Sequence, residues 1–336
     1  MQAETTVTEH QPYRVKVDEY RQFRRDGYLI VRNLISQEEV AEILQFTEDM
    51  QQGKVTLPGV PVPPDDLPDE ERRMFYERLH MPHRVGALFE RFLLHPRIGD
   101  VLEALIGPDV LALQSILFFK QPGHVGQGFH QDSYYIPTQP DTLCGAWLAL
   151  DPATKENGCL WMTPGSQAEP IYPDCDGVSE QGDISLIDIP QIKNASHPDT
   201  DKNTVSNIAL QYDNEVAAEM NPGDVVFFGG HIFHRSHANK ANFPRRALVT
   251  HYCNARSRVP WNHGYDYEGD NANYQHILLR GKTHLDYAQP RFGTACAANM
   301  PERYGRPDRE ALPKSMMGDD NGFMVIKPHD TDPHDH

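Results

Sequence analysis

Two short stretches, about a hundred residues apart, hold the residue types that metal chemistry needs. The first contains His130-Gln131-Asp132, and the second runs from Gly223 to His237. If the first stretch lies on a strand, the alternation of side chains puts His130 and Asp132 on one face. One further histidine from the second stretch would complete a 2-His-1-carboxylate triad, which leaves three coordination positions open and is typical of non-haem Fe(II) oxygenases.

The second stretch offers three histidines as the third ligand, namely His231, His234 and His237. If the strand ran unbroken through Gly229 and Gly230, His231 and His237 would share one face and His234 would lie on the other. Alternation alone therefore does not choose among the three. A bare His-x-Asp pair also occurs in surface turns, so the surrounding motifs must support the metal interpretation.

Those motifs follow one another between an apolar run at 110–119 and the arginine that comes after the last histidine. They are His130-Gln131-Asp132, Ala146-Trp147-x-Ala149-Leu150, Asn157-Gly158-Cys159-Leu160, Pro164-Gly165-Ser166, Gly223-Asp224-Val225-Val226-Phe227-Phe228, His234-x-Ser236 and Arg245. With these motifs, the sequence from about Tyr20 to Arg256 resembles the phytanoyl-CoA dioxygenase family, in the wider Fe(II)/2-oxoglutarate oxygenase superfamily. The resemblance implies a double-stranded β-helix, which is a jelly roll or cupin-like barrel.

The resemblance also implies the metal ligands, which are His130, Asp132 and His234. It selects His234 because the family places this ligand two residues before a serine and eleven before an arginine, which matches Ser236 and Arg245. The other two histidines of the second stretch then lie near the metal or at the rim of the site, and each stays an alternative ligand.

Arg245 is implied to bind the distal carboxylate of 2-oxoglutarate. A guanidinium offers a planar fork that binds a carboxylate through two parallel hydrogen bonds, which a lysine does not reproduce. Ser236 is implied to hydrogen-bond the same carboxylate, and the adjacent Arg246 stays an alternative to Arg245. Three further positions at which family members contact the co-substrate are occupied here by Gln114, Lys120 and Trp147.

The implied reaction uses Fe(II), 2-oxoglutarate and O2, releases succinate and CO2, and hydroxylates an unactivated carbon of a small-molecule metabolite. Related halogenases replace the carboxylate ligand with a small residue, so Asp132 favours hydroxylation, while desaturation and ring formation stay open. A cupin-like isomerase or a non-catalytic metal-binding module is the main alternative, but neither needs Arg245. A zinc hydrolase usually carries a general-base glutamate, and no His-Glu-x-x-His motif occurs here.

The amino-acid composition disfavours several classes of binding partner and substrate. The chain has 48 acidic and 31 basic residues and a net charge of −17, which disfavours nucleic acid and anionic membranes. Because no Lys/Arg run is present either, we expect a substrate smaller or less anionic than a coenzyme A thioester. No signal peptide or transmembrane stretch is recognised, and the five cysteines lack Cys-x-x-Cys spacing. These features predict a cytoplasmic protein with reduced thiols.

We expect one domain, mainly β with flanking helices, because short apolar or alternating runs bounded by Gly, Pro, Asn and Asp begin at Val110 and favour an antiparallel sandwich or barrel. Residues 1–17 are predicted to be a flexible N-terminus, and residues 18–256 the oxygenase domain with its N-terminal helices. Residues 257–336 are predicted to be a loop-rich extension of that domain. Whether the protein forms a homodimer through this extension stays open.

Several local elements are predicted within this plan. Ser36 to Glu39 form a capping box that begins a helix, and further predictions are a helix over 18–25, a strand over 28–31, and helices over 69–94 and 98–105. The segment from Ala168 to Met220 is long, polar and turn-rich, so we interpret it as a loop. It acts either as a lid over the substrate or as a variable surface insert.

Overall fold

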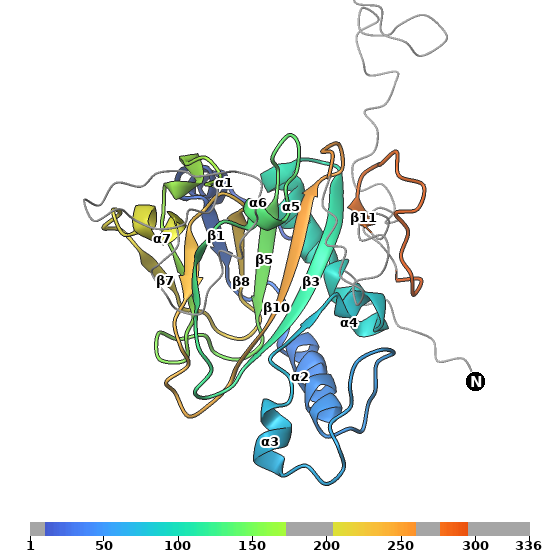
Figure 1. Cartoon of the computed structure of the whole chain (residues 1–336). Coiled ribbons are helices and arrows are strands. Elements are labelled where there is room, and N and C mark those ends of the chain that lie inside the picture. The colour runs from blue at the N-terminus through green and yellow to red at the C-terminus, as the bar shows by residue number, and fades with distance from the viewer. Residues whose placement is uncertain (1–10, 173–203, 260–275, 295–336) are drawn as a thin grey trace, which may run out of the picture. The chain divides into compact units, whose positions relative to one another are not determined.

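Two antiparallel β-sheets face each other and build the core, and helices cover the outer face of the larger sheet (Figure 1). The computed structural model describes residues 11–172, 204–259 and 276–294. The chain divides into two compact units, residues 1–298 and 299–336, and every described residue belongs to the first. The two-sheet architecture with flanking helices confirms the predicted jelly roll.

The larger sheet has seven strands. Their spatial order is β1 (Tyr28–Val31), β8 (Val225–Gly229), β5 (Cys144–Ala149), β10 (Arg245–Asn254), β3 (Val110–Lys120) and β11 (Ile277–Arg280), and β2 (Arg78–His80) also pairs with β3. The smaller sheet has four strands, in the order β4 (Gln127–His130), β9 (His234–Ser236), β6 (Leu160–Met162) and β7 (Val216–Ala218).

Seven α-helices and two 3-10 helices are found among the described residues. They are α1 (Val17–Asp26), α2 (Gln37–Gln51), α3 (Asp69–Met74), η1 (Pro82–Arg84), α4 (Ala87–Leu93), α5 (Pro96–Ile106), α6 (Asp132–Tyr135), η2 (Ser166–Ala168) and α7 (Thr204–Ala209). In the part of the chain that the structure covers, no helix combines the length and the apolar character that crossing a membrane requires.

The large sheet has two different faces, because side chains alternate along each strand. Leu117, Phe227 and Leu248 point outward and pack with helix residues such as Phe89 and Val101 in one apolar core. The helices therefore seal this face from water.

The inner face packs against the smaller sheet. Trp147, Phe228 and Val249 lie in a second apolar cluster with Leu160 and Met162 of β6. Strands β3 and β10 pair without a shift from Arg245 opposite Lys120 to His251 opposite Gln114, so their inward side chains form two neighbouring rows. These rows continue into the cavity described below.

The first two helices begin and end as local chemistry dictates. The Ser36 hydroxyl accepts a hydrogen bond from the Glu39 backbone N–H at 3.2 Å, and the Glu39 carboxylate accepts one from the Ser36 N–H at 3.1 Å. This is the predicted capping box, and α2 begins directly after it. Helix α1 ends at Asp26 and is followed by Gly27, whose positive φ of 82° suits a residue without a Cβ. The predicted strand over 28–31 and the helix over 98–105 are also confirmed.

The single helix predicted over 69–94 is wrong. The segment instead contains α3, the short strand β2, the 3-10 helix η1 and α4. Strand β2 pairs antiparallel with β3, from Arg78 opposite Phe118 to His80 opposite Ile116. Pro82 and Gly86 then prevent one continuous helix, because proline removes a helical donor and glycine weakens a helix interior. The helical pattern is therefore interrupted by a pairing that is distant in sequence.

The segment over 168–220 is not a plain loop where it is described. Helix α7 and strand β7 lie within it, and β7 pairs with β6. Residues 173–203 lie outside the described residues, so its role as a lid stays a prediction. Strand β11 falls inside the predicted C-terminal extension and pairs with β3, which was not expected. The predicted dimer contact and the domain boundary at 256/257 remain predictions.

Candidate metal and co-substrate site

His130 and Asp132 converge, but not on one strand as predicted. Strand β4 ends at His130, which pairs with His234 of β9. The chain then leaves the sheet, because the Ser133 N–H donates to the Gly230 carbonyl at 3.0 Å and the Ile136 N–H donates to the Asp132 carbonyl at 3.0 Å. Asp132 therefore begins the short helix α6. This helical turn directs its carboxylate toward the two histidines.

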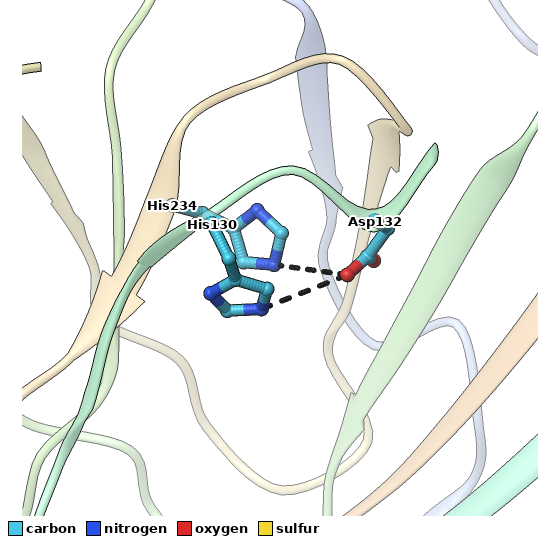
Figure 2. A group of neighbouring side chains, drawn as sticks. All are labelled: His130, Asp132 and His234. Carbon is cyan, nitrogen blue, oxygen red and sulfur yellow. Dashed lines mark ion pairs between the residues drawn. The ribbon is translucent and has the colours of Figure 1, made fainter. Parts of the chain in front are cut away.

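His130, Asp132 and His234 form a compact group, in which one ligand atom from each residue lies within 4.8 Å of the others. Figure 2 shows both imidazoles directed at the same carboxylate oxygen. Asp132 Oδ1 lies 3.6 Å from His130 Nε2 and 3.5 Å from His234 Nε2. Two imidazoles and one carboxylate are the donor set that suits Fe(II) with open positions.

The histidine tautomers leave the correct nitrogen free for a metal. His130 Nδ1 lies 2.9 Å from the Gly128 carbonyl, and His234 Nδ1 lies 3.0 Å from the Ile232 carbonyl. Because a carbonyl only accepts, both Nδ1 atoms carry the proton, and the Nε2 lone pairs face Asp132. Such backbone contacts also fix the orientation of metal-binding imidazoles.

The ionisation of the group agrees with this arrangement. Burial, reinforced by the nearby His234, lowers the pKa of His130 to about 4, so its imidazole is neutral at pH 7. Burial raises the pKa of Asp132, but the imidazoles of His234 and His251 outweigh burial and hold that pKa well below its usual range. The site therefore presents a carboxylate beside a neutral His130 imidazole, as metal binding requires.

The alternative histidines lie elsewhere. His231 Nε2 is 2.7 Å from Asp141 Oδ2, and its Nδ1 is 2.8 Å from the Glu169 carbonyl. The His237 ring packs edge-on against Trp161, with 5.5 Å between the centroids. Neither belongs to the group of His130, Asp132 and His234. The geometry therefore favours His234 as the third ligand.

Arg245 lies in the same cavity as the triad. Its side chain is buried, with 4% of the residue exposed, and its Cζ lies 5.2 Å from the centre of the Trp147 ring. Arg245 has no ion-pair partner among the described residues, and its Nε is buried without a hydrogen-bond acceptor there. Burial lowers the pKa of Arg245 to about 10, so the guanidinium stays charged at pH 7. A buried, unpaired cation of this kind fits an anionic ligand.

The adjacent Arg246 points to the opposite face of the sheet. Its Nε and Nη2 atoms donate to the Asp151 carboxylate at 2.8 Å and 2.9 Å, and its Nη1 lies 3.3 Å from Glu48 of α2. Arg246 is thus already paired, and it anchors α2 to β10. Arg245 is the arginine that faces the triad.

Lys120 pairs with Arg245 across β3 and β10, and Ser236 lines the same cavity. The Lys120 ammonium donates to Ser236 Oγ at 3.2 Å and to the His237 carbonyl. Gly158, in the Asn157-Gly158-Cys159-Leu160 motif, has a φ of 78°, and a Cβ there would lie 2.7 Å from Lys120 Nζ. The Asn157 side-chain amide oxygen Oδ1 accepts a hydrogen bond from the Thr154 N–H at 2.8 Å and holds this turn. The motif therefore makes room for the ammonium.

Gln114 was also predicted to contact the co-substrate, and this stays a prediction. It is buried opposite His251, but it is absent from the residues that line the cavity. The structure also brings in residues that were not predicted. The Gln127 amide nitrogen lies 3.2 Å from His130 Nε2, and His251 Nε2 lies 2.9 Å from Asp132 Oδ2. The even spacing of His251 from Arg245 along one strand was a usable signal for the second.

The cavity has a volume of about 380 Å³. Apolar side chains of the inner face surround the triad and Arg245, and polar residues are added toward β2 and the 124–127 segment. The lining includes Ile116, Phe118, Trp147, Leu160, Phe228, Val249, Glu77, Arg78, His124 and Gln127. A metal site, a buried cation and an apolar wall therefore share one space.

Known proteins resemble this chain in sequence. The family model for phytanoyl-CoA dioxygenase (PhyH) matches residues 23–247. The peroxisomal phytanoyl-CoA dioxygenase of Bos taurus is 25% identical over 266 residues, which cover 76% of this chain and 72% of that protein. A Danio rerio phytanoyl-CoA dioxygenase domain-containing protein 1 is 31% identical over 184 residues, which cover 54% of this chain and 57% of that protein. The chain thus spans little more than half of the zebrafish relative.

Solved structures show the same fold. EctD from S. alaskensis, with 2-oxoglutarate and 5-hydroxyectoine, has a TM-score of 0.55 and 20% identity, and the match covers 75% of this chain and 81% of that one. The epimerase SnoN, in complex with Fe3+, alpha ketoglutarate and nogalamycin RO, has a TM-score of 0.55 and 19% identity, with 79% and 93% covered. Because the family model matches most of the chain, the protein belongs to the phytanoyl-CoA dioxygenase family of Fe(II)- and 2-oxoglutarate-dependent oxygenases.

Proposed function

We propose that this protein hydroxylates an unactivated carbon of a small-molecule metabolite and couples that step to the decarboxylation of 2-oxoglutarate to succinate. One observation carries the proposal: the unpaired, buried Arg245 lines the same cavity as the group of His130, Asp132 and His234. A non-catalytic metal-binding module has no need for such an arginine. An anionic co-substrate satisfies both its charge and its orphan Nε.

In this proposal His130, Asp132 and His234 hold the Fe(II), which supplies the oxygen chemistry when bound. Arg245 binds the distal carboxylate of 2-oxoglutarate, because its planar fork matches two carboxylate oxygens. Ser236 adds a hydroxyl on the same side of the cavity. Hydrogen bonds of this type are strengthened in a dry site.

The remaining residues of the cavity exclude water and position the substrate. Trp147, Phe228 and Val249 form the apolar wall beside the triad. An apolar wall keeps solvent away from the reacting carbon and suits an aliphatic group of the substrate. The protein itself therefore orients the substrate and excludes water from the cavity.

The charges of the cavity favour a substrate less anionic than a coenzyme A thioester. Of the lining cations, Arg245 and Lys120 serve the co-substrate side, and Arg235 is held by Glu215 at 2.6 Å. Arg78 shares the cavity lining with the acidic Glu77. Several phosphates need several cations that are free to bind them, so we propose a small metabolite with little net negative charge.

The test begins with anaerobic binding of Fe(II) and 2-oxoglutarate, followed by succinate release in air across a panel of small metabolites and acyl-coenzyme A thioesters. We expect iron-dependent binding of 2-oxoglutarate and substrate-stimulated succinate from a small metabolite. Stimulation by an acyl-coenzyme A thioester alone would overturn the substrate proposal. Absence of iron-dependent 2-oxoglutarate binding would overturn the function itself.

A further inference from the structure

His251 is a fourth histidine at the triad, and among the described residues its imidazole forms a hydrogen bond only with the carboxylate of Asp132. It lies on β10 on the same face as Arg245, six residues further along, and only 5% of the residue is exposed. Its Nε2 lies 2.9 Å from Asp132 Oδ2. Because an ionised carboxylate only accepts, the imidazole donates this hydrogen bond.

The two oxygens of Asp132 are thereby given different neighbours. Oδ1 faces His130 Nε2 and His234 Nε2 at 3.6 Å and 3.5 Å, which is the side where a metal would be shared (Figure 2). Oδ2 is turned away toward His251. The carboxylate is therefore held in one rotation before any metal arrives.

Stability alone does not account for a histidine at this position. His251 Nδ1 is buried and has no hydrogen-bond partner among the described residues. An unsatisfied buried nitrogen carries an energetic cost that an apolar side chain avoids. The flanking inward residue on the same strand, Val249, is apolar and packs in the core between the sheets. The hydrogen bond with Asp132 therefore explains why a histidine occupies this position.

We propose that His251 is a positioning residue that makes Asp132 bind the metal through Oδ1 alone. A carboxylate that turns freely is able to bind a cation through one oxygen or through both, and the second mode fills a further coordination position. By occupying Oδ2, His251 orients the ligand and keeps that position open for the co-substrate. The inference rests on the proposed function, because it assumes the metal at His130, Asp132 and His234.

The test uses the full-length protein and compares His251→Leu, which lacks a donor, with His251→Gln, whose amide reaches to a similar distance and donates. Co(II) is the probe, because its visible spectrum reports coordination number and its affinity is measured without turnover. Loss of a partner that orients a ligand typically weakens metal affinity about 10- to 100-fold. We expect that loss and an altered Co(II) spectrum in His251→Leu, and recovery of most of both in His251→Gln.

His83→Gln is the matched control, because His83 is also fully buried but contacts Ser115 outside the cavity. It should change folding stability and leave the Co(II) affinity and spectrum as in the wild type. A His251→Leu protein that stays folded and binds Co(II) with the wild-type affinity and spectrum would overturn this inference alone. If instead the wild type bound neither Co(II) nor Fe(II) at the triad, the proposed function would fail first.

Discussion

The two faces of the large sheet use the same strands for different purposes. Along β10, Arg246, Leu248 and Tyr252 face the helices, where the Tyr252 hydroxyl donates to the Leu93 carbonyl at 2.8 Å. Arg245 and His251, on the same strand, face the cavity. Every titratable group named on the outward face is already paired within the protein, whereas Arg245 on the inward face is left without an ion-pair partner among the described residues.

The two faces of one strand therefore have separate roles, one in stabilising the fold and one in binding ligands. The helix-covered face supplies apolar burial, so substitutions there should act on the free energy of unfolding. The cavity face carries polar groups that cost stability, so substitutions there should act on ligand binding. The following predictions separate the two effects.

The largest effect is expected at the triad. His130→Ala, Asp132→Ala and His234→Ala should each abolish iron binding and turnover, because two ligands hold Fe(II) poorly. The metal-free proteins should stay folded. Elemental analysis measures the iron, and His231→Ala and His237→Ala are the controls that should retain it. Iron loss in His231→Ala with retention in His234→Ala would move the third ligand.

On the helix face, the corresponding test is Phe227→Ala. Phe227 is fully buried in the outer core, and truncation of a buried phenylalanine typically costs about 3–5 kcal/mol. Urea unfolding should show this loss, while iron and 2-oxoglutarate affinities stay unchanged in the folded fraction. Phe227→Leu should lose much less, since most of the apolar volume is kept. A change in 2-oxoglutarate affinity without a change in stability would contradict the separation of the faces.

The adjacent arginines provide the sharpest comparison, because they differ by one position and face opposite ways. Arg245→Ala removes one partner of a buried charge pair with 2-oxoglutarate, which typically costs about 2–5 kcal/mol, or roughly 30- to several-thousand-fold in affinity. The Michaelis constant for 2-oxoglutarate should rise accordingly, with iron content unchanged. Arg245→Lys should recover only part of the loss, because an ammonium does not bind both oxygens in one plane.

Arg246→Ala completes this comparison. It breaks the contacts with Asp151 and Glu48, so it should lower the free energy of unfolding and leave 2-oxoglutarate affinity intact. If the two arginines exchanged these effects, the assignment of faces along β10 would be wrong.

The last prediction concerns the pH dependence of stability. Burial lowers the pKa of His83 to about 3, from an ordinary value of 6.5. Between these values the unfolded chain binds a proton that the folded protein does not, so stability falls as pH drops from 6.5 toward 3, by up to about 1.4 kcal/mol per pH unit. Urea unfolding of the metal-free protein should show a steeper fall for the wild type than for His83→Gln. Equal slopes would remove His83 as the cause.

Features coded by neighbouring residues were predictable from sequence. The capping box of α2 depends on Ser36 and Glu39 alone, and it formed as expected. The three candidate metal ligands could be predicted because the motifs around them resemble those of a known family. That resemblance, rather than strand periodicity, selected His234 and Arg245, since Asp132 is on a helix and the strand between Gly229 and His234 is interrupted.

Features that depend on distant pairing were not predictable. The helix expected over 69–94 failed because β2 pairs with β3, and β11 was missed for the same reason. Gln114 was expected at the co-substrate; it pairs with His251 next to a register shift and is not among the residues that line the cavity, so its role stays a prediction. Local patterns contain no information about which strand lies alongside another.

Gly158 sets a condition for anyone who would transplant this site into another barrel. The positive φ of Gly158 and the closeness of Lys120 Nζ mean that any side chain there would displace the ammonium or the turn. Copying the triad, Arg245 and Lys120 onto a new scaffold would therefore reproduce the charges but not the space they occupy. The turn at Gly158 must be transferred together with these residues, although it contributes no functional atom of its own.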